Sequence, residues 1–258
     1  MTVGAIVAVV AHPDDEALIA GGTLALAHDR GLATGVVSLT RGELGPISDP
    51  LLAGESTLGA VRERELCASG ALLGVDWTRC LRHPDGELQW VDAEAVAGEL
   101  ATVLREFAPR VLLTFGEDGV YGHQDHIATR RICIRAAQLL APGGPLVYEA
   151  VWARELAGAL VADARSRGLA DSLWGIEPEA FGSPAGPATH VDVRAVVDRK
   201  LAALRAHRTQ LDAGHVLREL PADLAARHLG DEVWRAADPH APDVLAELLG
   251  ASKAPGHG

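Results

Sequence analysis

Apolar runs and helix-like segments alternate along the first half of the chain. Residues 3–10 are almost entirely apolar, as a strand covered on both faces is, and residues 33–39 are predicted to form a second strand. The segment between them, 16–30, has apolar residues at helical spacing, and Gly31 follows it, where glycine commonly ends a helix. A strand, a helix and a second strand in this order predict a parallel sheet with right-handed crossovers.

The same alternation continues further along the chain. Apolar positions three and four apart predict helices over 58–73, 91–107, 127–140, part of 154–168, and 193–207. Short apolar runs predict strands over 77–81, 110–115, 146–152 and 189–193. The fold class that follows is α/β, with a mostly parallel sheet flanked by helices.

Two adjacent glycines, Gly21 and Gly22, interrupt the first predicted helix. Each costs about 1 kcal/mol relative to alanine, and we expect close packing of this helix on the sheet to be the reason. No internal repeat or low-complexity linker divides the chain, so we expect one domain over 1–258. The tail from about residue 237 is rich in proline, and its end is expected to be mobile.

Composition narrows the classes of function. Of 258 residues, 23 are Lys or Arg and 35 are Asp or Glu, and the net charge of −12 argues against binding nucleic acid or anionic membranes through a basic surface. No apolar run reaches the roughly 18 residues of a membrane-spanning helix, and no secretory signal is expected before the first strand. Cys67, Cys80 and Cys133 are far apart, which disfavours a disulfide framework or an all-cysteine zinc site. We therefore expect a soluble cytoplasmic protein without membrane insertion.

Charged and metal-binding side chains gather in two clusters, each after a predicted strand. The first is AHPDDE at residues 11–16, and the second is YGHQDH at residues 121–126, which follows a glycine-rich loop. Open α/β sheets bind ligands at the carboxyl ends of their strands. We expect the two clusters to meet in space and to hold one catalytic metal.

The residue types in the clusters are those of a catalytic zinc site, which has three protein ligands and an exchangeable water. His12 and Asp15, three residues apart on a turn, can face one point. Either His123 or His126 can complete a His/Asp/His site, and the other can face the substrate. Because zinc lowers the pKa of bound water to about 7, Asp14 beside it can accept the proton. The pattern predicts metal-assisted hydrolysis.

Six short motifs connect these clusters to a known family. They are HPDDE at 12–16, TRGE at 40–43, RxxE at 62–65, PDG at 84–86, GHxDH at 122–126 and KLxxLxxHxxQ at 200–210. In this order they resemble the PIG-L/LmbE-like deacetylase family, which includes the N-acetylglucosaminyl deacetylases of mycothiol, bacillithiol and GPI-anchor synthesis. The resemblance covers most of residues 3–140 and then 189–210.

The resemblance implies a Rossmann-like sheet with its active site at the strand carboxyl ends. It implies a mononuclear zinc on three ligands, His12, Asp15 and His126. Asp14 resembles the family's general base. His123 resembles the histidine that stabilises the oxyanion or acts as an acid, with Asp125 orienting it. Tyr121 matches a tyrosine that some members place near the substrate carbonyl.

The resemblance also implies substrate-binding positions. Arg62 and Asp85 match positions that contact the sugar or its aglycone, and Glu43 is expected to line the same pocket. His207, on the C-terminal motif, is expected at the edge of the site. One position departs from the family's second motif, which usually reads HPDH: here Gln124 replaces the proline. Residue 124 therefore has a free φ angle and a backbone N–H, both of which proline would remove.

The function implied is a zinc-dependent hydrolase that removes the acetyl group from a small N-acetylglucosamine-type sugar conjugate. On the same scaffold, the alternatives are an amidase of a thiol S-conjugate and a deacylase of a glycolipid or antibiotic sugar. The loop 41–58 and the segment 153–188 are the expected pocket walls that decide among them. A nucleotide-binding Rossmann module is a distant alternative, since HPDDE stands where GxGxxG would. Iron or manganese can replace zinc in such a site, and members of the family often form homo-oligomers.

Overall fold

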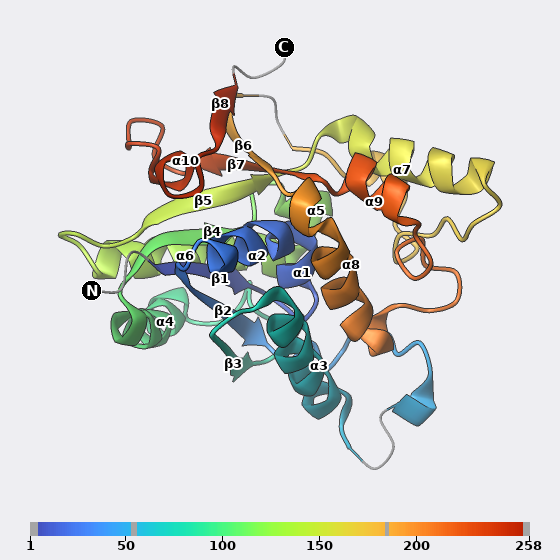
Figure 1. Cartoon of the computed structure of the whole chain (residues 1–258). Helices are drawn as coiled ribbons and strands as arrows, with labels where there is room; N and C mark the ends of the chain where they lie inside the picture. Colours follow the sequence, from blue (N-terminus) through green and yellow to red (C-terminus); the bar gives the residue numbers. More distant parts are fainter. Residues whose placement is uncertain (1–4, 53–55, 184–185, 255–258) are drawn as a thin grey trace.

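A sheet of eight strands runs through the described part of this computed structural model, which comprises residues 5–52, 56–183 and 186–254 (Figure 1). The strands are β1 (Ala5–Val10), β2 (Ala33–Thr40), β3 (Trp77–His83), β4 (Pro109–Thr114), β5 (Leu146–Val151), β6 (Ala188–Asp192), β7 (Asp231–Ala236) and β8 (Ser252–Ala254). Their order is β3-β2-β1-β4-β5-β7-β6-β8. The first five in this order are parallel, and the last three pair antiparallel. The prediction of a mostly parallel α/β sheet is confirmed.

Helices cover both faces of the sheet. They are α1 (Asp15–Ile19), α2 (Gly21–Asp29), α3 (Leu58–Leu73), α4 (Ala93–Phe107), α5 (Gly119–Gly122), α6 (Gln124–Leu139), α7 (Arg154–Ser166), α8 (Val197–Ala206), α9 (Ala222–His228) and α10 (Val244–Leu249). Short 3-10 turns lie at Pro50–Leu52, Pro178–Ala180, Arg194–Val196 and Arg208–Gln210. Helices α2, α3 and α8 pack together on one face, and α4 packs with α6 on the other (Figure 1). Strand β1, with every residue buried, lies between these layers.

The helix predicted over 16–30 is divided in two. The chain leaves helical geometry at Ala20 (φ −129°, ψ −2°), which separates α1 from α2. Gly22 follows the break, and a Cβ added there would lie 2.4 Å from Cβ of Val193. Its N–H donates to Glu232 Oε1 at 2.7 Å. Glu232 belongs to β7 and Val193 directly follows β6, so Gly22 packs closely against the sheet, as expected. At Gly21, in contrast, an added Cβ would meet Lys200 of α8 and Leu73 of α3.

The C-terminal third adds elements that the sequence pattern did not predict. Helix α9 and strand β7 lie between α8 and the tail, and α10 with the fully buried Leu245 and strand β8 lies within the tail itself. The expected mobile end, residues 255–258, lies outside the described residues, as do residues 3–4 of the first predicted strand. None of the helices in the described ranges has the length and apolar character needed to cross a bilayer.

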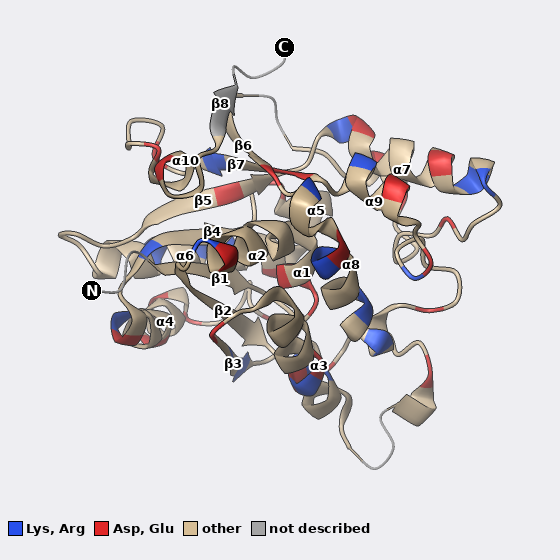
Figure 2. Ribbon diagram, viewed as in Figure 1, with Lys and Arg blue, Asp and Glu red and all other residues tan. Residues whose placement is uncertain are grey.

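Basic and acidic side chains are interspersed along the helices. Figure 2 shows Lys and Arg beside Asp and Glu on α3, α4, α7 and α9. Several are paired across elements, as Arg167 is with Asp223 at 2.6 Å. These four helices therefore carry mixed charge rather than a basic stripe.

Candidate active site

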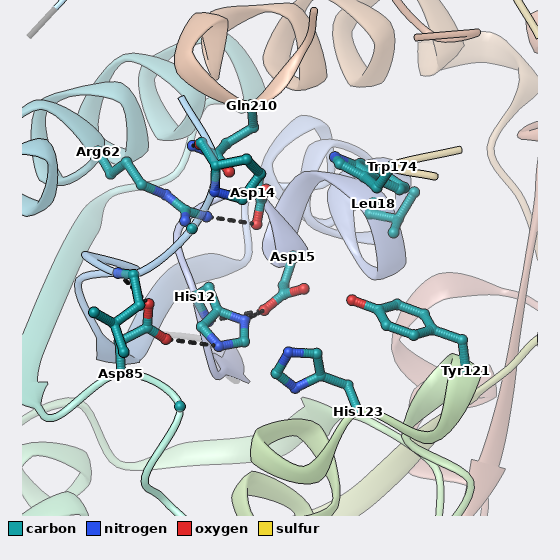
Figure 3. Close-up of a pocket in the computed structure, with 14 residues that line it drawn as sticks. His12, Asp14, Asp15, Leu18, Arg62, Asp85, Tyr121, His123, Trp174 and Gln210 are labelled. Carbon is teal, nitrogen blue, oxygen red and sulfur yellow. Dashed lines mark hydrogen bonds and ion pairs between the residues drawn. The ribbon is translucent and has the colours of Figure 1, made fainter. Parts of the chain in front are cut away.

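The two clusters meet at a pocket of about 320 Å3 beyond the carboxyl ends of β1 and β4 (Figure 3). His12, Asp14 and Asp15 reach it from the turn after β1. Tyr121 and His123 reach it from the segment after β4, and this meeting follows from the direct parallel pairing of the two strands. The expectation that both clusters contribute to one site is confirmed.

Asp14 occupies a strained position in the first turn. Its φ of 128° lies in the region that favours glycine, and a non-glycine residue there costs about 1–3 kcal/mol. Its N–H donates to Glu16 Oε2 at 2.9 Å, and the N–H of His12 donates to Asp15 Oδ2 at 2.8 Å. These bonds hold the turn so that the Asp14 carboxylate lines the pocket while the Asp15 carboxylate lies between two histidines.

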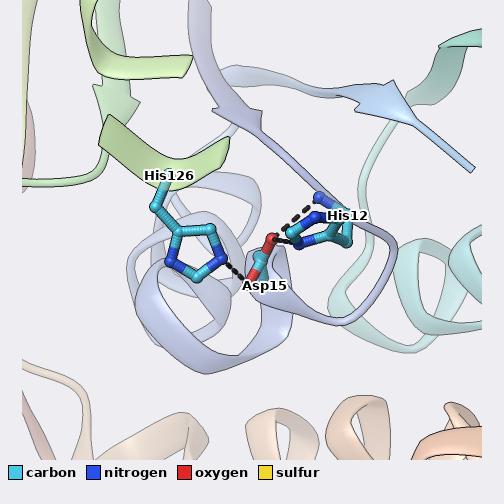
Figure 4. A group of neighbouring side chains, drawn as sticks. All are labelled: His12, Asp15 and His126. Atoms are coloured by element: carbon cyan, nitrogen blue, oxygen red, sulfur yellow. Dashed lines mark hydrogen bonds and ion pairs between the residues drawn. The ribbon is translucent and has the colours of Figure 1, made fainter. Parts of the chain in front are cut away.

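His12, Asp15 and His126 form a compact set of metal-ligating side chains (Figure 4). Asp15 Oδ2 lies 3.2 Å from His12 Nδ1, and Asp15 Oδ1 lies 3.2 Å from His126 Nε2. His126 Nδ1 lies 3.0 Å from the carbonyl of Gly119, which can only accept, so Nδ1 carries the proton and Nε2 a lone pair. That buried Nε2 has no hydrogen-bond partner among the described residues. A buried lone pair beside a carboxylate and a second imidazole fits a divalent metal.

Two carboxylates orient His12 through Nε2, the ring nitrogen that does not face Asp15. His12 Nε2 lies 3.1 Å from Asp85 Oδ1 and 3.3 Å from Asp125 Oδ2, so Nε2 carries the proton and Nδ1 faces Asp15. Burial alone would raise the pKa of Asp85, but the hydrogen bond from His12 lowers it to about 2. A carboxylate behind a ligating histidine fixes its tautomer and raises its basicity.

Asp125 therefore serves a different histidine from the one predicted. Its carboxylate accepts N–H groups of Gly86 at 2.7 Å and Leu88 at 3.1 Å besides its contact with His12. His123 instead accepts the backbone N–H of Asp125 at Nδ1, 3.2 Å away, and caps α6. The expectation that the Asp125 carboxylate orients His123 is wrong, because the 84–88 turn and His12 occupy that carboxylate.

His123 is an uncharged hydrogen-bond donor toward the pocket. Burial, together with the neighbouring His126 and His12, lowers its pKa to about 4. Because Nδ1 accepts a backbone N–H, Nε2 carries the proton. Tyr121 points its hydroxyl into the same space (Figure 3), and burial raises its pKa above the usual range, so the hydroxyl stays protonated. Both groups can donate to a developing oxyanion.

Asp14 has the properties of a proton acceptor. Burial raises its pKa to about 6, against the opposing attraction of Arg62. Arg62 NH2 lies 3.2 Å from Asp14 Oδ1 and donates to the carbonyl of Pro13 at 2.6 Å. The Gly42 carbonyl accepts a hydrogen bond from Arg62 NH1 at 2.8 Å. A Cβ at Gly42 would lie 2.3 Å from the same NH1 atom. This contact explains the glycine of the TRGE motif.

Two predicted substrate-binding residues, Glu43 and His207, are absent from the described residues that line the pocket. Glu43 is exposed, and its carboxylate accepts the N–H of Asp85 at 3.3 Å. His207 is 1% exposed, and its Nε2 lies 2.7 Å from Glu16 Oε1. The expectation that Glu43 lines the pocket is therefore wrong; its carboxylate holds Asp85, which does line it. His207 contacts Glu16, the residue after Asp15, rather than the pocket itself.

Glu16 is a supporting residue whose partners the sequence did not reveal. Fully buried, it accepts a hydrogen bond from Ser69 Oγ at 2.6 Å and pairs with His207 through Oε1, while Oε2 accepts from the N–H of Asp14. Its place in HPDDE was the only sequence signal. Trp174 also lines the pocket, from a segment without any recognised motif.

Comparison with known proteins agrees with this geometry. The sequence profile of PIG-L, described as GlcNAc-PI de-N-acetylase, matches residues 7–137. The chain belongs to the PIG-L family. A 1D-myo-inositol 2-acetamido-2-deoxy-alpha-D-glucopyranoside deacetylase of Acidothermus cellulolyticus is 32% identical over 250 residues, which cover 87% of this chain and 85% of that protein.

Solved structures extend the likeness over the whole fold of this PIG-L family protein. The N,N'-diacetylchitobiose deacetylase of Pyrococcus horikoshii is 25% identical with a TM-score of 0.61, over 90% of this chain and 83% of that one. GalB, a 4-carboxy-2-hydroxymuconate hydratase of Pseudomonas putida, has a TM-score of 0.66 at 20% identity over 93% and 99% of the chains, which shows a shared fold only. The fold thus accommodates different reactions, and the nucleotide-binding alternative is wrong for a PIG-L family member.

Proposed function

We propose that this PIG-L family protein removes the N-acetyl group from an N-acetylglucosamine-type sugar conjugate, with His12, Asp15 and His126 holding a divalent metal. The observation that carries the proposal is the convergence of three lone pairs, from His12, Asp15 and His126, within 4.8 Å of one another in a pocket that Asp14 also lines. Metal-dependent hydrolysis of an amide uses both features: a metal site and an adjacent proton acceptor.

The residues around that site divide the chemical work. The bound metal supplies an activated water and polarises the amide carbonyl. Asp14 accepts the proton of the water and passes it to the leaving amine. His123 Nε2–H and the Tyr121 hydroxyl donate to the carbonyl oxygen as negative charge develops on it. Arg62 holds the Asp14 carboxylate in place at 3.2 Å.

The substrate we propose is a small amino sugar carrying an aglycone. The relative from Acidothermus cellulolyticus deacetylates an inositol-linked glucosamine derivative, and it aligns with most of this chain. Arg62 and Asp85 line the pocket beside Asp14 and offer charged groups that bind sugar hydroxyls. Polar groups of this kind fix orientation in small-molecule sites.

The remaining assignments belong to the same proposal. Zinc is the metal that best suits two imidazoles and one carboxylate with an open position. The three cysteines are free, which agrees with a reducing cytoplasm. We propose that the chain acts as a single domain over 1–258, on small molecules rather than nucleic acid, in a homo-oligomer like other family members.

Amine release from a panel of N-acetyl sugars tests this function. The panel contains free N-acetylglucosamine, its myo-inositol conjugate, diacetylchitobiose and a thiol S-conjugate. We expect the metal-loaded protein to release amine from N-acetylglucosamine conjugates, chelator-treated protein to release none, and added zinc to restore the rate. Release from the S-conjugate alone would favour the amidase alternative, and no release from any member would refute the proposal.

A further inference from the structure

One wall of the pocket is apolar and lies on a segment that carries no family motif. Trp174, in the stretch between α7 and β6, lines this wall together with Leu18. Figure 3 shows these two side chains on the side of the pocket away from Arg62 and Asp85. The pocket therefore has a polar side for sugar hydroxyls and an apolar side whose ligand the catalytic residues do not explain.

The backbone that carries Trp174 is held in an unfavourable conformation. Its φ is 51°, in the left-handed region that bulky residues rarely adopt. The loop is tied to a second segment by two backbone bonds, from Ser172 N–H to the Gly214 carbonyl at 3.1 Å and from Val216 N–H to the Ser172 carbonyl at 2.9 Å. Strain of this kind persists where the surroundings over-determine the backbone, and it clusters at ligand sites.

The indole is supported by a buried, uncharged histidine. The rings of Trp174 and His215 lie 4.2 Å apart at 64°. His215 is 2% exposed, accepts the N–H of Leu217 at Nδ1, and burial lowers its pKa to about 4. A neutral support fixes the indole without adding charge to this wall. The ring is therefore preorganised, which lowers the entropy cost of stacking a ligand on it.

We propose that Trp174 determines specificity by stacking against the aglycone of the amino sugar, which must present a flat, apolar ring face. The proposal rests on the proposed function, because the metal site and the polar wall fix where the N-acetyl group and the sugar hydroxyls lie. An indole gains most from contact with a flat face, such as the C–H face of a cyclitol or an aryl ring. Free N-acetylglucosamine has no aglycone to place against Trp174.

Two substitutions separate stacking from folding. Trp174→Gly removes the ring and suits the left-handed φ, so the backbone loses its strain. Trp174→Phe keeps a smaller flat ring. Trp90→Ala is the matched control, since Trp90 is 74% exposed and lies outside the described pocket lining.

The measurement is the ratio of kcat/KM for a conjugate to kcat/KM for free N-acetylglucosamine, with the myo-inositol and p-nitrophenyl conjugates as probes. We expect Trp174→Gly to lower the ratio about tenfold, mainly through KM, and Trp174→Phe to lower it about threefold or less. Trp90→Ala should leave the ratio unchanged. An unchanged ratio in Trp174→Gly, or an equal loss for free sugar and conjugates, would overturn the role in aglycone recognition.

Binding of the deacetylated products separates this proposal from the proposed function. Calorimetry on the metal-loaded protein should give weaker binding of glucosaminyl-inositol, about tenfold, for Trp174→Gly than for wild type. If wild type releases amine but Trp174→Gly keeps its preference and affinity for conjugates, only the role of Trp174 fails. A wild-type protein that neither hydrolyses nor binds any conjugate overturns both.

Discussion

Replacing Asp125 by asparagine tests which histidine this side chain serves. One buried carboxylate accepts from the N–H groups of Gly86 and Leu88 and contacts His12 Nε2 at 3.3 Å. The asparagine side chain would offer one acceptor oxygen, and its NH2 group would face a second donor. His12 and Gly86 share Oδ2, and Leu88 uses Oδ1. Whichever way the amide is turned, the charged hydrogen bond that supports His12 is lost or becomes a neutral one, while the backbone N–H that His123 accepts remains.

The magnitude follows from the kind of bond removed. Hydrogen bonds to charged groups contribute about 1.5–3 kcal/mol, which is about 10- to 150-fold in an equilibrium constant. Asp85 still contacts His12 at 3.1 Å, so we expect metal affinity to fall about 10- to 100-fold, the usual range for such supporting groups. Competition with a chromophoric zinc chelator measures this affinity directly.

The same experiment can refute the reasoning. If Asp125→Asn bound zinc like the wild type but lost kcat at saturating metal, the carboxylate would act on His123 or the substrate instead. Glu43→Gln is the control, because Glu43 is exposed and accepts only the 3.3 Å bond from Asp85 N–H among the hydrogen bonds described. Its zinc affinity should stay within about twofold of wild type, less than one charged hydrogen bond is worth.

Four further substitutions test the base, the ligand set and the packing. Asp14→Asn should keep the metal and lower kcat by about 10²–10⁴; steady-state kinetics at the wild-type rate would remove Asp14 from the role of base. His126→Ala should lose the metal, and full zinc occupancy by elemental analysis would exclude it as a ligand. Gly22→Ala should lower the free energy of unfolding by about 1–3 kcal/mol, because its Cβ would lie 2.4 Å from Val193. Gly98→Ala, with no atom within 4 Å of the added Cβ, should raise it by about 0.5–1 kcal/mol in the same urea titration.

Local rules predicted the parallel half of the sheet and the site at its edge. Strand β1 is buried over its whole length, so its apolar run needed no alternation to be recognised. The clusters after β1 and β4 could be joined because strand carboxyl ends share one edge in a parallel sheet. The sequence does not say how far apart the two clusters lie. They lie close together because β1 pairs directly with β4.

Contacts between distant segments could not be predicted. Asp125 has one histidine two residues away, His123, and another 113 residues away, His12. The sequence favours the nearer one, but the carboxylate contacts the farther one. Which one it meets depends on where the turn around Gly86 places its N–H groups. The left-handed φ of Trp174 likewise follows from bonds to another segment, and no local residue signals it.

The pair formed by Glu16 and His207 links residues 191 positions apart. During synthesis the turn that bears Asp14 emerges first, and it lacks this support until α8 has been made. A chain cut before α8 would keep all of residues 7–137, which match the family profile, but would leave the carboxylate of Glu16 without its imidazole partner. The support of the Asp14 turn therefore depends on the chain as far as His207, and hydrolysis by a growing chain would report that this segment has docked.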